Sequence, residues 1–504
     1  MQVVKCNHIV FLCILRDLNL ISSNIKVNCD KHKAMKRIVI LGAGITALST
    51  AYKLAQTNNY DITLLEKDDV VGGLAKSIKF NDVISDLGPH RIFSHYPEVL
   101  NFIKQIARED FIYVSRKSKI FIKNRFVEYP IKSGEILKTF GFSASIQSFF
   151  SFITQKIKKL FSSPELNSYS EYIKNYFGKY LYGLLFHQYA KKVWGIEPEQ
   201  ISADVARTRV SAGGLGTVIR QKILGESSTN LTTVKNLGYI KGGIGKLSQK
   251  MADELAKQGV KIVLSADFQD INFENDKITL NFKHNEILET LHSEFCVSTI
   301  PITNLVDKIL NKKYDTKISE LINIFQYINT VFVFLIVKRS RISENSWLYF
   351  PEADIIFNRG YESKNFDSSL APKDESVICL EVTYLKGDTI DKQSDNAIIE
   401  KVKEDFLKTK LVQKEEILSA HSLRVENIYP LYEINYFSKL KSVLGYLSQF
   451  ENLYSAGRQG LFNHNNIDHC IYMGFKLADA IIKDAKPAQW YANIDEFRNF
   501  KIID

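Results

Sequence analysis

The sequence predicts an α/β fold, because three separated Gly-rich blocks each adjoin an apolar run of strand length. The first apolar run, 38–41, leads into Gly42-Ala43-Gly44 and then into a helix-compatible stretch. Glycines return in two later blocks, at 238–245 and 453–460, and a helical pattern follows each of them. One discontinuous Rossmann-like domain with two insertions explains this spacing, whereas tandem domains do not.

The first block has the order strand, Gly-rich turn, helix, strand. Gly42 permits a tight turn, Gly44 lets a ligand approach the backbone, and Ala47 is small where helix meets strand. The helix N-terminus offers N–H groups to a pyrophosphate, and the second strand, 62–65, ends on Glu66, which can accept hydrogen bonds from a ribose. This order predicts a dinucleotide site. We expect the cofactor-binding residues of this block to be Gly42, Gly44, Ile45, Thr46 and Glu66.

The composition is that of a soluble globular protein with two or three structural units. The chain has 504 residues, of which 45% are hydrophobic and 24% charged. Its net charge of +10 comes from lysines spread along the chain, so we expect no nucleic-acid partner, although a positive field favours an anionic substrate or an acidic lipid surface. The six cysteines include no C-x-x-C pair, which argues against a metal site and for a reducing, cytoplasmic location.

Changes in composition divide the chain into segments. Residues 1–34 precede a second methionine and the first strand, so we expect them to be a disordered or non-native extension. Residues 97–230 are helical by periodicity and rich in Phe, Tyr and Lys, which predicts a helical insertion. Strand-like runs within 306–444 predict a second, antiparallel or mixed sheet in a substrate domain. The discontinuous nucleotide-binding domain then comprises 35–96, 231–305 and 445–490.

One segment of the predicted insertion is unusual. Residues 140–161, FGFSASIQSFFSFITQKIKKLF, combine phenylalanines with three lysines near the end. Such a helix can lie on a membrane surface or belong to a domain and carry a solvated basic end. We favour the domain helix. No apolar run approaches the roughly 20 residues that a membrane-spanning helix needs.

Six sequence blocks, in order, support a resemblance to a known family. By these blocks the chain resembles the FAD-dependent amine oxidase and protoporphyrinogen oxidase superfamily, and within it the UDP-galactopyranose mutase branch. The blocks are GAGITAL, VVGGLAKS, DLGPHRIFSHY, YAKKVWGIEPEQISADVARTRVS, WLYFPEADIIFNR and AGRQGLFNHNNIDHCIYMG.

The resemblance implies FAD as the cofactor and extends its site to later blocks. It implies that His90 lies near the flavin N5 and that Arg458 contacts FAD, with the flavin ring beside the helix start at Asp468. The further positions that it implies along the flavin are Gly72, Gly73, Leu74 and Gly88.

The resemblance also implies a substrate site. Arg209 and Arg359 match the arginines that bind a nucleotide-sugar diphosphate in the mutases, and Tyr349 matches a nearby tyrosine. Together with His90, these form our candidate catalytic set. Two arginines suit a diphosphate, because each guanidinium can pair bidentately and keeps its charge.

One departure keeps two functions open. Mutases carry a tyrosine in the last block, where this sequence has Asn463-His464. We therefore expect an FAD-dependent oxidoreductase that acts on an anionic small molecule, with a nucleotide sugar as one candidate. The alternative is UDP-galactopyranose mutase, in which reduced FAD isomerises a UDP-sugar with no net oxidation.

Overall fold

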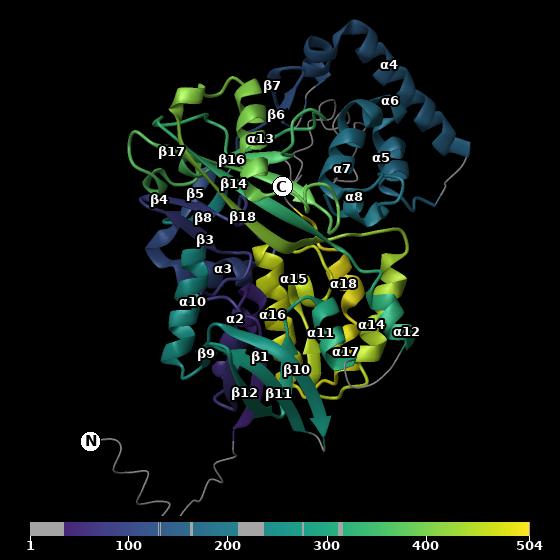
Figure 1. Cartoon of the computed structure of the whole chain (residues 1–504). Coiled ribbons are helices and arrows are strands. Elements are labelled where there is room, and N and C mark those ends of the chain that lie inside the picture. Colours follow the sequence, from purple (N-terminus) through teal and green to yellow (C-terminus); the bar gives the residue numbers. More distant parts are fainter. Residues whose placement is uncertain are drawn as a thin grey trace, which may run out of the picture.

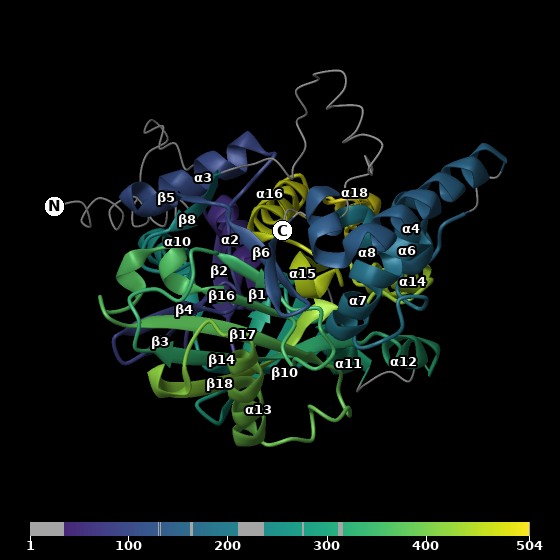
Figure 2. The same ribbon diagram turned by 90° about the horizontal axis from the view of Figure 1, so that it is seen from above.

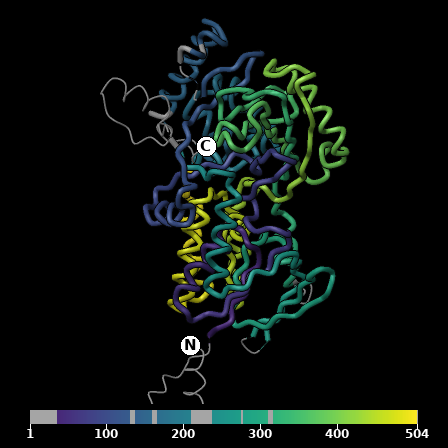
Figure 3. The backbone as a smooth tube through the Cα atoms, turned by 90° about the vertical axis from the view of Figure 1, so that its left-hand side faces the viewer, coloured from purple at the N-terminus to yellow at the C-terminus, as the bar shows by residue number. Residues whose placement is uncertain are grey.

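The computed structural model describes residues 35–129, 131, 133–161, 165–209, 236–274, 277–310 and 316–502. The predicted extension 1–34 and the segment 210–235 lie outside the described residues. The elements gather around two large sheets (Figure 1). Purple, teal and yellow segments interleave around the first sheet in Figure 3, and green segments form most of the second.

The first sheet is parallel throughout and has the order β19-β13-β1-β2-β9. Its strands come from three widely separated parts of the chain, and β1 is buried from Ile38 to Leu41, as expected for a parallel sheet covered on both faces. Helices α2 (Ile45–Ala55), α10 (Gly245–Lys257) and α16 (Ile467–Ile482) pack beside it. The strands are β1 (Lys36–Leu41), β2 (Tyr60–Leu65), β9 (Lys261–Val263), β13 (Phe295–Ser298) and β19 (Leu453–Ser455).

The second sheet has seven strands in the order β18-β14-β17-β16-β15-β6-β7 and is mixed, because β15 pairs with β6 in parallel. Strand β14, which pairs with both β18 and β17, is buried along its whole length. The alternating side chains of this strand enter two different cores, Val331 and Val333 on one face and Phe332 and Phe334 on the other. The strands are β6 (Ser118–Ile122), β7 (Arg125–Glu128), β14 (Tyr327–Val337), β15 (Trp347–Tyr349), β16 (Arg359–Glu362), β17 (Ser376–Tyr384) and β18 (Ile417–Pro430).

Three smaller sheets complete the strand set of the described residues. They are the antiparallel β10 (Ala266–Glu274), β11 (Lys277–His284) and β12 (Ile287–Ser293); β3 (Ser77–Phe80) with β4 (Val83–Asp86); and β5 (Phe111–Ser115) with β8 (Asn236–Ile240). The first of these lies at the end of the molecule away from the second sheet (Figures 1 and 3).

Helices surround both sheets. Those from α4 to α8 group at one side of the second sheet (Figures 1 and 2). None of the helices in the described ranges has the length and apolar content needed to cross a bilayer. The α-helices not yet given are α3 (Pro97–Ala107), α4 (Ser133–Phe161), α5 (Tyr169–Phe177), α6 (Lys179–Leu181), α7 (His187–Trp194), α8 (Ala203–Arg209), α11 (Ile302–Leu310), α12 (Thr316–Ile322), α13 (Asp395–Lys408), α14 (Tyr436–Leu447), α15 (Gly457–Gly460), α17 (Pro487–Tyr491) and α18 (Ile494–Arg498).

The structure differs from the sequence prediction in two segments. Residues 97–230, predicted as helical, include the strands β5, β6 and β7, and the partners of β5 and β6, which are β8 and β15, lie far along the chain. Within 306–444, where strand-like runs are predicted, the apolar residues 355–357 lie outside any strand, and β16 begins at Arg359 itself. Both differences depend on contacts between distant segments, which a local pattern does not contain.

The contact between α16 and α2 predicts that Gly474→Ala will destabilise the protein. A Cβ at Gly474 would clash with Ser49 Oγ and would lie 2.8 Å from the backbone oxygen of Thr46. Overpacking of this kind costs about 1–3 kcal/mol, and we expect that decrease in the free energy of unfolding measured by urea titration. Gly445→Ala in α14 is the control, since a Cβ there has no neighbour within 4 Å. Equal stability of the two variants would contradict the close packing of α16 on α2.

Candidate functional site

A cavity of about 1080 Å³ opens at the carboxyl ends of the parallel strands. The chain enters it directly after β1, β2 and β13 and again at the start of α15. This edge of an α/β sheet is where ligands ordinarily bind. The cavity exceeds the roughly 300–1,000 Å³ typical of pockets for drug-sized ligands, so it has room for a dinucleotide and a second small molecule.

Most of the predicted cofactor residues line this cavity. Those that do are Gly42, Gly44, Ile45, Thr46, Glu66, Gly72, Gly73, Leu74, Gly88, His90 and Arg458. Asp468 lies outside the lining, although its helix neighbours Ile467 and Cys470 contribute to it. The structure therefore brings the first and the last Gly-rich block to one cavity, whereas none of the residues 238–245 belongs to its lining.

The turn after β1 has the shape that a phosphate cradle requires. Gly42 has a φ of +93°, and a Cβ there would lie 2.6 Å from Thr299 Oγ1, so a larger residue would be both strained and crowded. Gly44 differs, because the nearest atom to a Cβ at that position is the backbone oxygen of Gly72, 4.0 Å away. The space beside Gly44 is therefore open. Since Gly44 is also the N-cap of α2, a phosphate can approach the helix N-terminus closely.

Glu66 occupies the position after β2 that the fingerprint predicts. Its carboxylate accepts hydrogen bonds from the backbone N–H of Ala43, at 2.7 Å, and of Asp68, at 3.0 Å. Burial raises the pKa of this carboxyl, and the two backbone N–H groups counteract that effect. Glu66 thus joins the Gly-rich turn to the next strand while it faces the cavity, where its remaining lone pairs can accept from a ribose.

His90 links two of the loops that line the cavity. Its Nε2 lies 3.1 Å from the backbone oxygen of Leu74 and 2.9 Å from that of Leu87. Since carbonyl oxygens only accept, Nε2 carries the proton and donates to them. Burial lowers the pKa of His90 and outweighs the nearby Asp86 carboxylate, which raises it. The ring is therefore neutral at pH 7. These contacts give His90 a positioning role within the loop 87–90.

Asp86 fixes the start of the same loop. Its carboxylate accepts hydrogen bonds from Ser77 Oγ at 2.6 Å, from the Tyr239 hydroxyl at 2.6 Å and from the backbone N–H of Ile244 at 3.0 Å. The Tyr361 hydroxyl donates to its backbone oxygen. A buried carboxylate with this many donors holds the chain tightly, because removal of any one donor would leave part of a buried charge unsatisfied.

Arg359 reaches the cavity from the start of β16. Its guanidinium makes an ion pair with Glu381 at 2.6 Å and donates to the Tyr429 hydroxyl at 2.5 Å. Burial on its own lowers the pKa of Arg359, but the Glu381 carboxylate raises it well above its ordinary value, so the side chain stays charged. Among the described residues, Glu381 Oε1 has no hydrogen-bond partner. This buried oxygen is therefore open to a donor on a ligand.

Arg209 reaches the same cavity from the end of α8. One of its Nη atoms is 2.8 Å from His464 Nε2, and the His464 ring lies 4.9 Å from that of Tyr429. Burial, followed by the charges of Arg209, Arg458 and Arg359, lowers the pKa of His464 well below its ordinary value. His464 is therefore neutral and accepts from Arg209.

Arg458 completes this group. It donates to the backbone oxygens of Ile428, at 2.7 and 3.0 Å, and of Asn465, at 2.9 Å, and its guanidinium lies 4.8 Å from the Tyr429 ring. We call Arg209, Arg359, Arg458, Tyr429 and His464 the arginine cluster. The six sequence blocks include its arginines and His464, whereas they miss Tyr429 and Glu381 because neither lies in any of these blocks.

Tyr349 lies outside the lining of the cavity, while Trp347, two residues earlier in β15, belongs to it. The two rings stack at 5.9 Å, and Tyr349 packs instead with Tyr129 and Tyr189. The sequence analysis predicts Tyr349 as a substrate residue, whereas in the structure Trp347 lines the cavity and Tyr349 does not. The ring that faces it is that of Trp347, against which the Arg91 guanidinium lies at 4.3 Å.

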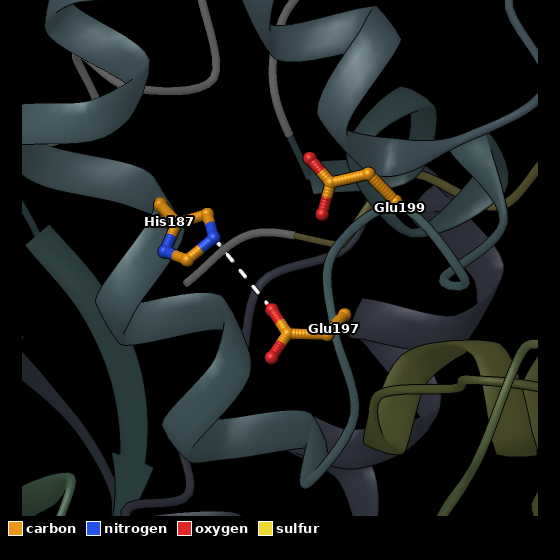
Figure 4. Close-up of side chains that lie close together, drawn as sticks. All are labelled: His187, Glu197 and Glu199. Atoms are coloured by element: carbon orange, nitrogen blue, oxygen red, sulfur yellow. Dashed lines mark ion pairs between the residues drawn. The ribbon is translucent and has the colours of Figure 1, made fainter.

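His187, Glu197 and Glu199 lie together on the helical side of the molecule, with ligand atoms within 4.8 Å of one another (Figure 4). His187 Nε2 is 3.7 Å from Glu197. Lys191 pairs with Glu197 at 2.6 Å, and Lys174 pairs with Glu199 at 3.1 Å. Because these lysines supply the positive charge that a metal ion would bring, we assign no metal to this cluster.

Burial of Asp468 predicts a measurable pH dependence of stability in the ligand-free protein. Burial raises the pKa of Asp468 to about 7, so between about pH 4 and pH 7 the folded state keeps a proton that the unfolded chain has released. Folding stability must fall as the pH rises through this window. We expect Asp468→Asn to reduce the stability difference between pH 5 and pH 8 by about 2 kcal/mol, measured by urea titration.

The control is Asp479→Asn on the same helix, whose side chain is 44% exposed. It should leave the pH dependence close to that of the unsubstituted protein. If Asp468→Asn gave the same pH profile as this control, the proton would not reside on Asp468.

Comparison with known proteins agrees with this geometry. Residues 45–427 match the protein family described as flavin containing amine oxidoreductase. Protoporphyrinogen oxidase 2 of Arabidopsis thaliana is 23% identical over 486 residues, which cover 89% of this chain and 94% of that protein. A probable UDP-galactopyranose mutase of Klebsiella pneumoniae is 28% identical over 177 residues, covering 34% of this chain and 44% of the mutase.

Solved structures share the fold. A reduced UDP-galactopyranose mutase superposes with a TM-score of 0.77 at 23% identity, covering 93% of this chain and all of the mutase. A protoporphyrinogen oxidase-like protein from Exiguobacterium sp. 255-15 superposes with a TM-score of 0.70 at 18% identity, covering 88% of this chain and 98% of that one. With the family match over residues 45–427 and the cofactor cradle at the sheet edge, the chain belongs to the flavin containing amine oxidoreductase family and is an FAD-dependent flavoprotein.

Proposed function

We propose that this flavoprotein is an FAD-dependent oxidoreductase that acts on an anionic small molecule, with a nucleotide sugar as the leading candidate. The observation that carries the proposal is the arginine cluster, in which three guanidinium groups surround Tyr429 and the neutral His464. Arg458 donates to backbone carbonyl oxygens, which do not offset its charge. The cluster therefore presents positive charge to the cavity.

This charge argues against an amine as the substrate. An alkylammonium ion would have to give up its hydration beside several guanidinium groups, which repel it. A phosphate or diphosphate binds favourably instead, because arginine offers parallel N–H donors that match its oxygens. The family name describes amine oxidation, but the polarity of this cavity favours a substrate of opposite charge.

The residues present fit FAD, and the protein and the cofactor have different roles. The glycine turn and Glu66 would hold the adenosine end, and the loop 87–90, fixed by Asp86 and His90, would border the flavin. The redox chemistry is supplied by the flavin ring when it is bound. The arginine cluster would bind and orient the substrate's anionic group, and Glu381 Oε1 would accept a hydrogen bond from the ligand.

A mutase of the UDP-galactopyranose type is the second candidate, and Tyr429 is the observation that favours it. The sequence lacks a tyrosine in the last Gly-rich block, yet the fold brings Tyr429 from β18 next to His464. A phenol beside two arginines is the arrangement expected for a diphosphate. The departure at Asn463-His464 is therefore weaker evidence against a mutase than it is in the sequence alone.

Arg359→Lys tests the anion site. Lysine keeps a positive charge beside buried Glu381, so the fold should persist, but it does not have the planar fork that pairs with phosphate. Removal of a charged hydrogen bond costs about 1.5–3 kcal/mol, so we expect UDP, as the probe, to bind at least about tenfold more weakly by calorimetry. The ratio of FAD to protein should not change.

Arg339→Lys is the matched control. Arg339 also pairs with a glutamate, Glu416 at 2.8 Å, but it lies outside the cavity lining. UDP should bind this variant as it binds the unsubstituted protein. If the unsubstituted protein has no affinity for UDP, the substrate is not a uridine nucleotide; if both variants show the same decrease in affinity, the site is elsewhere.

A turnover experiment separates the two functions. The protein is reduced anaerobically with dithionite and supplied with UDP-galactopyranose, and the products are resolved by chromatography. Formation of the furanose isomer would establish the mutase and overturn the oxidoreductase proposal. We expect no isomer. We also expect the visible absorbance of the oxidised flavin to bleach when the oxidised protein is given an oxidisable anionic sugar nucleotide, because the flavin accepts the hydride.

A further inference from the structure

Helix α4 exposes apolar side chains along one face. Phe142, Ile146, Phe149, Phe150, Ile157 and Phe161 recur at helical spacing after the break at Gly141. Their exposed fractions run from 39% for Ile146 to 85% for Phe161. We call these six residues the apolar stripe. It extends over about 30 Å at 1.5 Å per residue.

The opposite face of α4 is the one that packs on the protein. Ala144 and Ser148 are buried, and Ser151 Oγ accepts from the backbone N–H of Tyr180 at 3.0 Å. Helix α4 contacts α5 and α6. A helix on the surface of a soluble domain normally buries its large apolar residues and exposes its polar ones. In α4 this arrangement is reversed.

Such a reversal leaves a row of large apolar side chains in water along one face of the helix, which is typical of a site that another surface covers. The helix also extends away from the rest of the molecule (Figure 2). Each of the six side chains of the stripe is at least 39% exposed within the part of the chain that the structure describes, so a flat partner can reach them.

The charge of this helix indicates what that partner is. Residues 139–161 contain three lysines and no acidic residue, and both Lys156 and Lys158 are exposed. Lys156 Nζ lies 5.2 Å from the Phe152 ring, next to the stripe. Apolar residues flanked by lysines suit the interface of a membrane with anionic lipids. A second copy of the chain fits less well, because residues 139–161 contain no carboxylate that could pair with these lysines across the contact.

We propose that α4 lies in the surface of an anionic membrane, with its apolar stripe at the boundary between headgroups and acyl chains. The lysines then contact the lipid phosphates. This attachment is independent of the proposed substrate, since the stripe lies outside the lining of the cavity. It requires no helix that crosses the bilayer.

The test is flotation of the FAD-loaded protein with vesicles of phosphatidylglycerol and phosphatidylcholine, compared with vesicles of phosphatidylcholine alone. We expect binding to the anionic vesicles and much weaker binding to the neutral ones. The variant Phe142→Ser/Phe149→Ser/Phe150→Ser should bind at least about tenfold more weakly, because each phenylalanine contributes buried apolar area in the bound state. Added salt should weaken binding of the unsubstituted protein.

The control variant is Ile287→Ser/Leu288→Ser. These residues are 66% and 63% exposed on β12, far from α4 in Figure 1, and their substitution should leave vesicle binding unchanged. FAD content and thermal unfolding are measured on every variant to establish that each is folded. A folded triple variant that still floats with anionic vesicles would overturn the proposal, as would an unsubstituted protein that binds neither kind of vesicle. A dimer in sedimentation that dissociates in the triple variant, without lipid binding, would assign the stripe to a second copy instead.

Discussion

The parallel register of the first sheet is the constraint on which the site depends. Parallel strands present their carboxyl ends at one edge, so Gly42, Glu66, Thr299 and Gly457 meet there although they are spread over most of the chain. A shift of any one strand would move its loop away from the others. The long insertions between the strands are tolerated because they leave this edge open and contribute the walls of the cavity.

Buried charge holds the polar side chains of those walls in place. Arg359, Glu381 and Asp86 are held by hydrogen bonds that compensate for their removal from water, and a buried ion pair of this kind adds little net stability. Its contribution is to fix geometry. The cluster around Tyr429 keeps its guanidinium groups at set positions before any ligand arrives, so binding costs less conformational entropy.

The sequence predicts the βαβ unit closely, because its signals are local. Strand, turn, helix and acid follow one another within about thirty residues, as in other units of this kind, and β1, α2 and β2 form as expected. Glu381 and Tyr429 carry no such signal. They lie on strands of the second sheet, and only the pairing of β17 and β18 with β14 brings them beside Arg359. Their role depends on the tertiary fold, which a single sequence does not reveal.

Sequence periodicity does not fix the orientation of a helix on the protein, even where it predicts the helix correctly. The spacing of phenylalanines in 140–161 indicates a helix, and α4 includes that segment. Period alone does not say which face packs on the protein, because an apolar stripe ordinarily points inward. Here Ala144, Ser148 and Ser151 pack inward and the phenylalanines of the stripe do not. The sequence-based preference for an ordinary domain helix assumes the usual orientation, in which the apolar face packs on the protein. In α4 the apolar face points to solvent, and this reversed orientation is the physical reason to assign it to a membrane.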